Sequence, residues 1–133
     1  MESVNFFRVA EFERKGRRRV FVGFAEKGYY LNASGELRHR RKKITQRDKR
    51  RRGYVELNRA TGQNDAAGVP IFENDVCRVA LGNGTAETVI RFKTNVAAFV
   101  AMLERGRIKV PFAFLDKEDA TIWRIGTIYD KMR

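Results

Sequence analysis

Asp65, Glu73 and Asp75 are closely spaced acidic residues in the middle of the sequence and are the first candidates for chemistry. Paired carboxylates can act as general acid and base or hold a divalent metal ion. A metal-dependent nuclease is therefore the least implausible enzyme for this chain. Each of the three acids, however, stands where a turn favours a capping side chain, which explains it without catalysis. We expect no catalytic residue and no metal site.

Histidine and cysteine are too scarce for other common sites. His39 is the only histidine and lies among basic residues, and Cys77 is the only cysteine. One of each cannot supply the usual ligand set of a zinc site. The Gly82-Asn83-Gly84 stretch lacks the later Gly and Lys of a phosphate-binding loop. We therefore expect no cofactor and no enzymatic activity, and we expect Cys77 to be a buried apolar residue.

Positive charge is the strongest chemical signal, and it is concentrated in the first half. The chain has 133 residues and a net charge of +12. Residues 1–60 carry a net charge of +11, whereas residues 61–133 carry +1. Lys and Arg at this density favour phosphate contacts to nucleic acid, with little sequence specificity. The candidate phosphate-binding residues are Arg17, Arg18, Arg19, Arg38, Arg40, Arg41, Lys42, Lys43, Arg47, Lys49, Arg50, Arg51 and Arg52.

Aromatic residues interleave with these basic residues, and two interpretations of them stay open. Together they could bind single-stranded nucleic acid by phosphate contact and base stacking. Aromatic residues also build β-sheet cores, which we favour for most of them. Tyr29 and Tyr30 are adjacent, so in a strand they face opposite sides and one of them would be exposed. The basic run from Arg38 to Arg52 could equally be a solvated tether without a dedicated ligand.

The elements that must position these residues are mostly strands. Gly82-Asn83-Gly84 predicts a tight hairpin turn, because Asn-Gly suits the primed turn types. The helical spacing of Val96, Phe99, Val100 and Leu103 predicts one helix at about 95–105. Strands are predicted at 4–12, 18–25, 28–32, 36–38, 54–57, 76–81, 85–92, 107–115 and 121–129.

Turn chemistry is densest between Thr61 and Val76. Asp65 and Gly68 suit the first and fourth positions of a type I turn. Pro70 has no N–H for a sheet ladder, so the short run around it belongs to an edge strand or lies outside a sheet. Asn74 is one of the few residues besides glycine that readily adopts the left-handed conformation.

This stretch, T-G-Q-N-D-A-A-G-V-P-I-F-E-N-D-V, resembles the signature of the YopX family, small proteins of phages, prophages and other mobile elements. The segment W-R-I-G-T-I-Y-D, from Trp123 to Asp130, is similar to the family's closing strand, and Phe7-Arg8 to its opening Phe-Arg. The resemblance implies a mainly β fold, with a small SH3-like curled β-barrel in the C-terminal part. It brings no catalytic residues, because none is established for the family.

The predicted organisation is an N-terminal β meander at 1–37, a basic loop or linker at 38–53, and the barrel with its one helix at 54–133. The barrel and the meander could pack as one compact domain. No apolar run is long enough to cross a membrane. The N-terminus lacks the pattern of a secretion signal, and a single cysteine suits a reducing compartment. We expect the cytoplasm of a bacterial host.

The leading hypothesis is a non-enzymatic, phage- or prophage-encoded accessory protein that binds DNA or RNA through its basic segment. The alternative is a protein-interaction module that acts on a host or phage protein, with an exposed sheet edge near Pro70 as the docking site. Self-association into a homo-oligomer through such an edge is a variant of this alternative.

Overall fold

The computed structural model describes residues 6–25, 27–40, 53–82, 84–93, 98–103, 108–111 and 120–132. The chain divides into two compact units. Unit 1 comprises Met1–Asn58 and Tyr129–Arg133, and unit 2 comprises Arg59–Ile128. The chain therefore leaves unit 1 after residue 58 and returns to it at residue 129. Most of the predicted linker at 38–53 lies outside the described residues.

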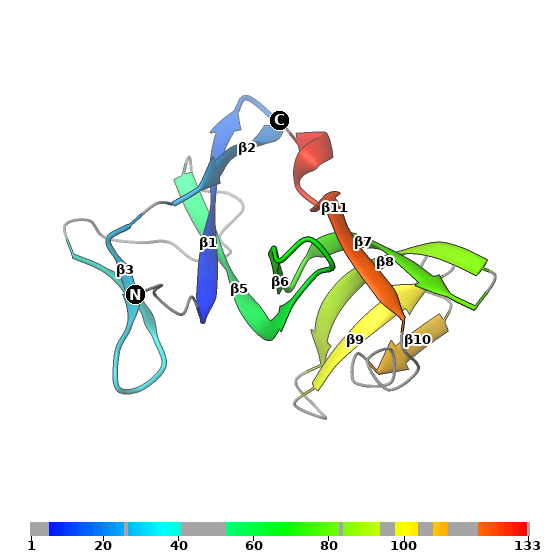
Figure 1. Ribbon diagram of the computed structural model, residues 1–133. Helices are drawn as coiled ribbons and strands as arrows, with labels where there is room; N and C mark the ends of the chain where they lie inside the picture. Colours follow the sequence, from blue (N-terminus) through cyan, green and yellow to red (C-terminus); the bar gives the residue numbers. More distant parts are fainter. Residues whose placement is uncertain are drawn as a thin grey trace. The chain divides into compact units, whose positions relative to one another are not determined.

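Unit 1 is built on an antiparallel hairpin of β1 (Phe7–Lys15) and β2 (Arg18–Phe24), with the first half of β5 (Gly53–Asn64) beside β1 (Figure 1). The turn between β1 and β2 contains Gly16, whose φ is 66°. Glycine adopts this left-handed conformation without a steric cost, which fixes the turn at this point of the sequence. A 3-10 helix, η2 (Asp130–Met132), completes the unit.

Aromatic rings fill the core of unit 1. Phe12 stacks on Tyr54 with 4.8 Å between ring centroids and lies 5.6 Å from Phe21. Tyr129 enters this cluster from the C-terminal segment and stacks on Phe21 at 5.0 Å. Aromatic pairs in such geometries stabilise a core beyond their buried area. The C-terminal return of the chain is therefore part of this core.

A second hairpin of unit 1 pairs β3 (Tyr29–Leu31) with β4 (Leu37–His39), which confirms the two strands predicted at 28–32 and 36–38. Leu37 is buried in a cluster with Val9 and Val55. Tyr29 packs against the same cluster, and its hydroxyl donates a hydrogen bond to Glu11. Tyr30 points the other way and is exposed, as the alternation of the two tyrosines predicts.

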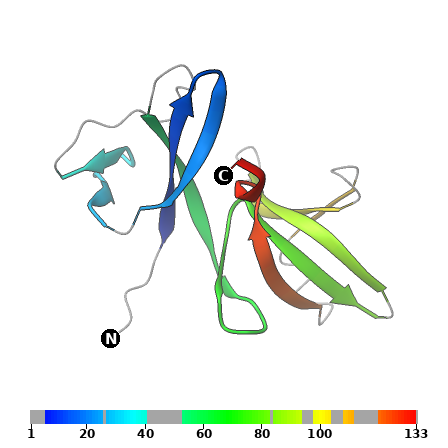
Figure 2. The same ribbon diagram turned by 90° about the horizontal axis from the view of Figure 1, so that it is seen from above.

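Unit 2 contains a five-stranded antiparallel sheet, which is strongly curled (Figures 1 and 2). Its strands, in spatial order, are β10 (Ile108–Pro111), β9 (Ala98–Leu103), β8 (Gly84–Lys93), β7 (Asp75–Leu81) and β11 (Thr121–Thr127). The end of β5 pairs with the short strand β6 (Pro70–Phe72). β6 ends its sheet, which confirms the predicted edge position of Pro70. The mainly β character is confirmed.

The core of unit 2 is one cluster of buried residues from β6 and the sheet strands. Its buried members are Ile71, Cys77, Val79, Ile90 and Ala101. Cys77 is fully buried in this cluster, so its predicted place as a buried apolar residue is confirmed. The hairpin predicted at residues 82–84 is also confirmed, because Leu81 of β7 pairs with Gly84 of β8.

The helix predicted at about 95–105 is wrong over residues 98–103, which form β9 between β8 and β10. The physical reason is that a short apolar run fits both periods. Ala101 faces the core and is paired with Ile90 of β8. Because β8 lies alongside, residues 98–103 find their backbone partners in a neighbouring strand. The flanking residues 95–97, 104 and 105 lie outside the described part of the chain.

β5 continues beyond the strand predicted at 54–57 and includes Gly62, whose φ is 82° and where the pairing with β6 is irregular. Within the part of the chain that the structure covers, none of the helices has the length and apolarity to span a bilayer.

Candidate functional site

The Asp65 turn is held by the aspartate itself. Its Oδ1 accepts hydrogen bonds from the backbone N–H groups of Ala67 at 2.9 Å and Val69 at 2.8 Å. The N–H of Gly68, whose φ is 83°, donates to the Asp65 carbonyl at 3.0 Å. An aspartate bonded in this way makes a tight turn by itself, so the predicted turn is confirmed.

The same turn covers the free edge of β11. Asp65 Oδ2 accepts the backbone N–H of Arg124 at 2.9 Å, and the N–H of Ala66 donates to the Ile122 carbonyl at 2.8 Å. β11 is an end strand of its sheet, and an end strand leaves backbone groups unpaired unless another segment satisfies them. The Asp65 turn therefore satisfies two such backbone groups of β11, the Arg124 N–H and the Ile122 carbonyl.

These contacts also determine the charge state of Asp65. Burial raises the pKa of its carboxyl, but the hydrogen bonds from the backbone N–H groups of Arg124, Val69 and Ala67 and the positive charge of Arg124 outweigh that effect. The pKa of Asp65 is therefore lower than its ordinary value. A carboxylate held this way is ionised at neutral pH and is a poor proton donor.

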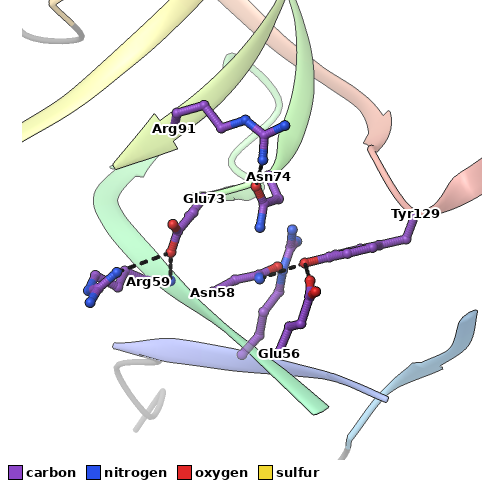
Figure 3. Close-up of polar contacts among 8 residues, drawn as sticks. Glu56, Asn58, Arg59, Glu73, Asn74, Arg91 and Tyr129 are labelled. Atoms are coloured by element: carbon purple, nitrogen blue, oxygen red, sulfur yellow. Dashed lines mark hydrogen bonds and ion pairs between the residues drawn. The ribbon is translucent and has the colours of Figure 1, made fainter. Parts of the chain in front are cut away.

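Asp75 and Glu73 are likewise bound to the protein. Asp75 is fully buried; its Oδ2 accepts the Phe72 N–H at 2.8 Å, and its Oδ1 accepts the Arg124 Nε–H at 3.1 Å. Glu73 Oε1 accepts the backbone N–H of Arg59 at 3.1 Å and lies 3.6 Å from its guanidinium (Figure 3). Each acid therefore stabilises a turn or strand, which favours the structural interpretation.

Asn74, between these acids, contacts β8 and the residue that follows β11. Its φ is 72°, the left-handed conformation predicted for it. Its N–H donates to the Ile90 carbonyl at 2.7 Å, its carbonyl accepts the N–H of Ile128 at 3.0 Å, and its side chain contacts Arg91 (Figure 3). Among the described residues, no three His, Cys, Asp or Glu side chains gather closely enough to hold a metal ion.

Unit 1 contains a buried polar chain that the sequence did not reveal. Arg8 Nε donates to Asn58 Oδ1 at 3.0 Å, Asn58 Nδ2 donates to the Tyr129 hydroxyl at 2.9 Å, and that hydroxyl donates to Glu56 at 3.0 Å (Figure 3). Asn58 and Tyr129 are 0% and 1% exposed, so no substrate can reach them. This series of hydrogen bonds anchors the C-terminal segment at Tyr129. Its only sequence signal is that Tyr129 belongs to the closing motif.

The candidate phosphate-binding residues that the structure describes lie on the two hairpins of unit 1. At the β1–β2 turn, Arg14 pairs across the strands with Arg19 and Lys15 pairs with Arg18. Arg17 and Arg18 are exposed, and Arg19 is half-buried. We call these five residues, Arg14, Lys15, Arg17, Arg18 and Arg19, the basic turn.

Arg38 and Arg40 lie on the second hairpin and are exposed. Arg38 forms an ion pair with Glu36 at 2.8 Å in which both side chains are about half exposed to solvent. Such exposed pairs contribute little free energy. Eight further candidates lie outside the described residues: Arg41, Lys42, Lys43, Arg47, Lys49, Arg50, Arg51 and Arg52.

Two exposed aromatic side chains each lie opposite an arginine on a neighbouring strand. In unit 1, Tyr30 is 44% exposed and pairs with Arg38. In unit 2, Trp123 is 39% exposed and pairs with Arg78, with Ile125 exposed on the same strand. The sequence predicted that one of Tyr29 and Tyr30 is exposed, but not which one. It did not predict the exposure of Trp123, because aromatic residues in strands are more often part of the core.

Comparisons with known proteins identify the family but give no activity. A family model described as YopX protein matches residues 19–132, which is most of the chain. The comparisons found no curated protein and no solved structure with significant similarity to this chain. The signature turn, the closing segment and this match agree, and the chain belongs to the YopX protein family.

Proposed function

We propose that this protein is a non-enzymatic accessory protein that binds nucleic acid through phosphate contacts from the basic residues of unit 1. The observation that carries the proposal is the register of the β1–β2 hairpin. It places Arg14 opposite Arg19 and Lys15 opposite Arg18. Like charges directly opposite each other destabilise a hairpin, so a polyanion that neutralises them has a favourable place to bind.

The absence of enzymatic activity is part of the proposal and is supported by the bonding of the acids. A nuclease would use Asp65, Glu73 and Asp75 as metal ligands or as a general base. Instead, the carboxylates of Asp65 and Asp75 bind backbone N–H groups and Arg124, and that of Glu73 binds Arg59. Releasing them for catalysis would unfold the turns that they hold.

The biological setting is proposed from the family and the composition. Members of this family are carried by phages and prophages, so the protein would act in the cytoplasm of a bacterial host. A reducing compartment suits the single buried thiol of Cys77. We also propose that the curled sheet of unit 2 corresponds to the SH3-like barrel that the family resemblance implies.

A salt titration of binding tests the mechanism. If about six basic side chains contact duplex phosphates, the slope of log K against log salt is expected to be about −5, and each lost contact reduces its magnitude by about 0.9. Arg18→Gln should therefore flatten the slope measured with a short labelled duplex. Neutralising Arg50, Arg51 and Arg52 together should flatten it further.

Arg78→Gln is the matched control, because it removes the same charge from an exposed strand residue of unit 2. It should leave the slope unchanged. Tight binding whose affinity does not depend on salt concentration would overturn the proposed surface. So would an equal change of the slope in Arg18→Gln and Arg78→Gln.

A protein-interaction module is the second candidate function, and the exposed pair Trp123 and Ile125 on β11 favours it. Exposed apolar side chains on a strand face can contribute to a protein interface. Under this alternative, a bound protein would stay associated after nuclease treatment and would be lost in Trp123→Ser. Retention that depends on nucleic acid would reject it.

A further inference from the structure

The strands of the second hairpin place three exposed side chains on one face. Tyr30 lies directly opposite Arg38. Arg40 follows two residues later, and its N–H continues the ladder to the Gly28 carbonyl at 3.0 Å. Side chains two residues apart along an extended chain share a face, so Arg40 lies on the Tyr30 side. We call Tyr30, Arg38 and Arg40 the Tyr30 face.

The opposite side of the hairpin explains why this face is open. Tyr29 and Leu37 pack on the core of unit 1, and His39 lies against the Tyr29 ring at 4.7 Å. These contacts anchor the hairpin with its other face in solvent. Folding therefore leaves Tyr30 44% exposed, directly opposite Arg38 on the neighbouring strand.

We infer that the Tyr30 face is a stacking platform for single-stranded nucleic acid, with Tyr30 under a base and Arg38 and Arg40 on the flanking phosphates. The inference rests on the proposed function. A base inside a duplex is stacked on both sides and cannot reach Tyr30, whereas an unpaired base can. The exposed ring favours this occupant over an acidic peptide, because both ligands are anionic but only nucleic acid places a base beside each phosphate.

Glu36 competes with the ligand for Arg38. Their exposed ion pair, at 2.8 Å, is weak enough for a phosphate to replace it. Removing this carboxylate should therefore strengthen binding, which a purely structural role of Arg38 would not produce. Glu36→Gln is expected to raise the affinity for a single strand up to about fivefold, the equivalent of an exposed pair of about 1 kcal/mol.

The test compares a labelled oligothymidine with a duplex of equal length across a range of salt concentrations. Tyr30→Ala should weaken single-strand binding by roughly 5- to 150-fold, which corresponds to a stacking free energy of about 1–3 kcal/mol. The loss should be the same at every salt concentration, because stacking releases no counterions. Duplex binding should be unchanged. Tyr30→Phe keeps the ring and should bind as the wild type does.

Trp123→Ala is the matched control, because Trp123 is an exposed aromatic residue opposite an arginine in unit 2. It should leave single-strand binding unchanged. If Tyr30→Ala binds normally while salt-dependent binding persists, the platform is refuted and the proposed function stands. If the wild type binds neither probe at low salt, both are refuted. Loss of duplex and single-strand binding together in Tyr30→Ala would also overturn the platform.

Discussion

Tyr129 and Tyr54 make the sharpest comparison in unit 1, because both rings lie in one aromatic cluster but their hydroxyl groups differ. The Tyr129 hydroxyl accepts a hydrogen bond from Asn58 and donates one to Glu56. The Tyr54 hydroxyl is buried and has no hydrogen-bond partner among the residues that the structure describes. The two rings contact Phe12 at 5.2 Å and 4.8 Å. Replacing either tyrosine with phenylalanine keeps this packing.

Tyr129→Phe is expected to lower the free energy of unfolding by about 2–3 kcal/mol. Asn58 is fully buried, so its side-chain N–H loses its acceptor where water cannot replace it. An unsatisfied buried donor costs about 1–3 kcal/mol, and the lost hydrogen bond to the Glu56 carboxylate adds to this. Tyr54→Phe removes a hydroxyl that is buried without a partner and is expected to be neutral or stabilising by up to about 1 kcal/mol.

Urea unfolding of the wild type and both variants, followed by circular dichroism, measures the two changes on one scale. The slope of free energy against urea should stay constant, which shows that the same surface is exposed. Equal effects of the two substitutions would refute the reasoning. So would a Tyr129→Phe variant within about 0.5 kcal/mol of the wild type, the range of an ordinary surface change.

The remaining predictions concern the turns. The pKa of Asp65 is lowered in the folded protein, so its contribution to stability is complete above its unfolded pKa of about 4 and is lost as the pH falls through the folded value. Acid titration of urea unfolding should show this loss, and Asp65→Asn should remove it; an unchanged acid profile in Asp65→Asn would contradict the assignment. Gly16→Ala should cost about 1–2 kcal/mol, because φ is 66° but no atom lies within 4 Å of the added Cβ. Gly28→Ala should cost more, since φ is 101° and the new Cβ would overlap the His39 ring; thermal unfolding of both variants compares them, and a smaller loss in Gly28→Ala would disprove the packing.

Local features were predictable where a few neighbouring residues determine the conformation. The Asp65 turn, the left-handed Asn74 and the hairpin between β7 and β8 each depend on the chemistry of a few neighbouring residues. The segment 98–103 was not predictable in this way. Its apolar residues fit a helix as well as a strand, and the choice depends on β8 lying alongside to pair with it.

The candidate site likewise has one part that the sequence predicts and one part that it does not. The sequence located the basic residues but not their relation to the exposed aromatics, because which tyrosine faces the core depends on where the hairpin packs. Leu37 is buried with Val9 and Val55, and Tyr29 packs against this cluster. Burial of this face of the hairpin leaves Tyr30 exposed to solvent. Hydrophobic burial of one face thus selected the other face for exposure.

The sequence by itself determined the family, the positions of the tight turns and the concentration of positive charge in the first half. Only the tertiary structure decided two long-range connections. Asp65 satisfies the edge of β11 at Arg124, and Tyr129 returns to Asn58 and Glu56 in the core of unit 1. Residues so far apart in sequence meet only after the chain has closed long loops, at an entropy cost that the whole fold must offset. No local sequence pattern predicts these long-range contacts.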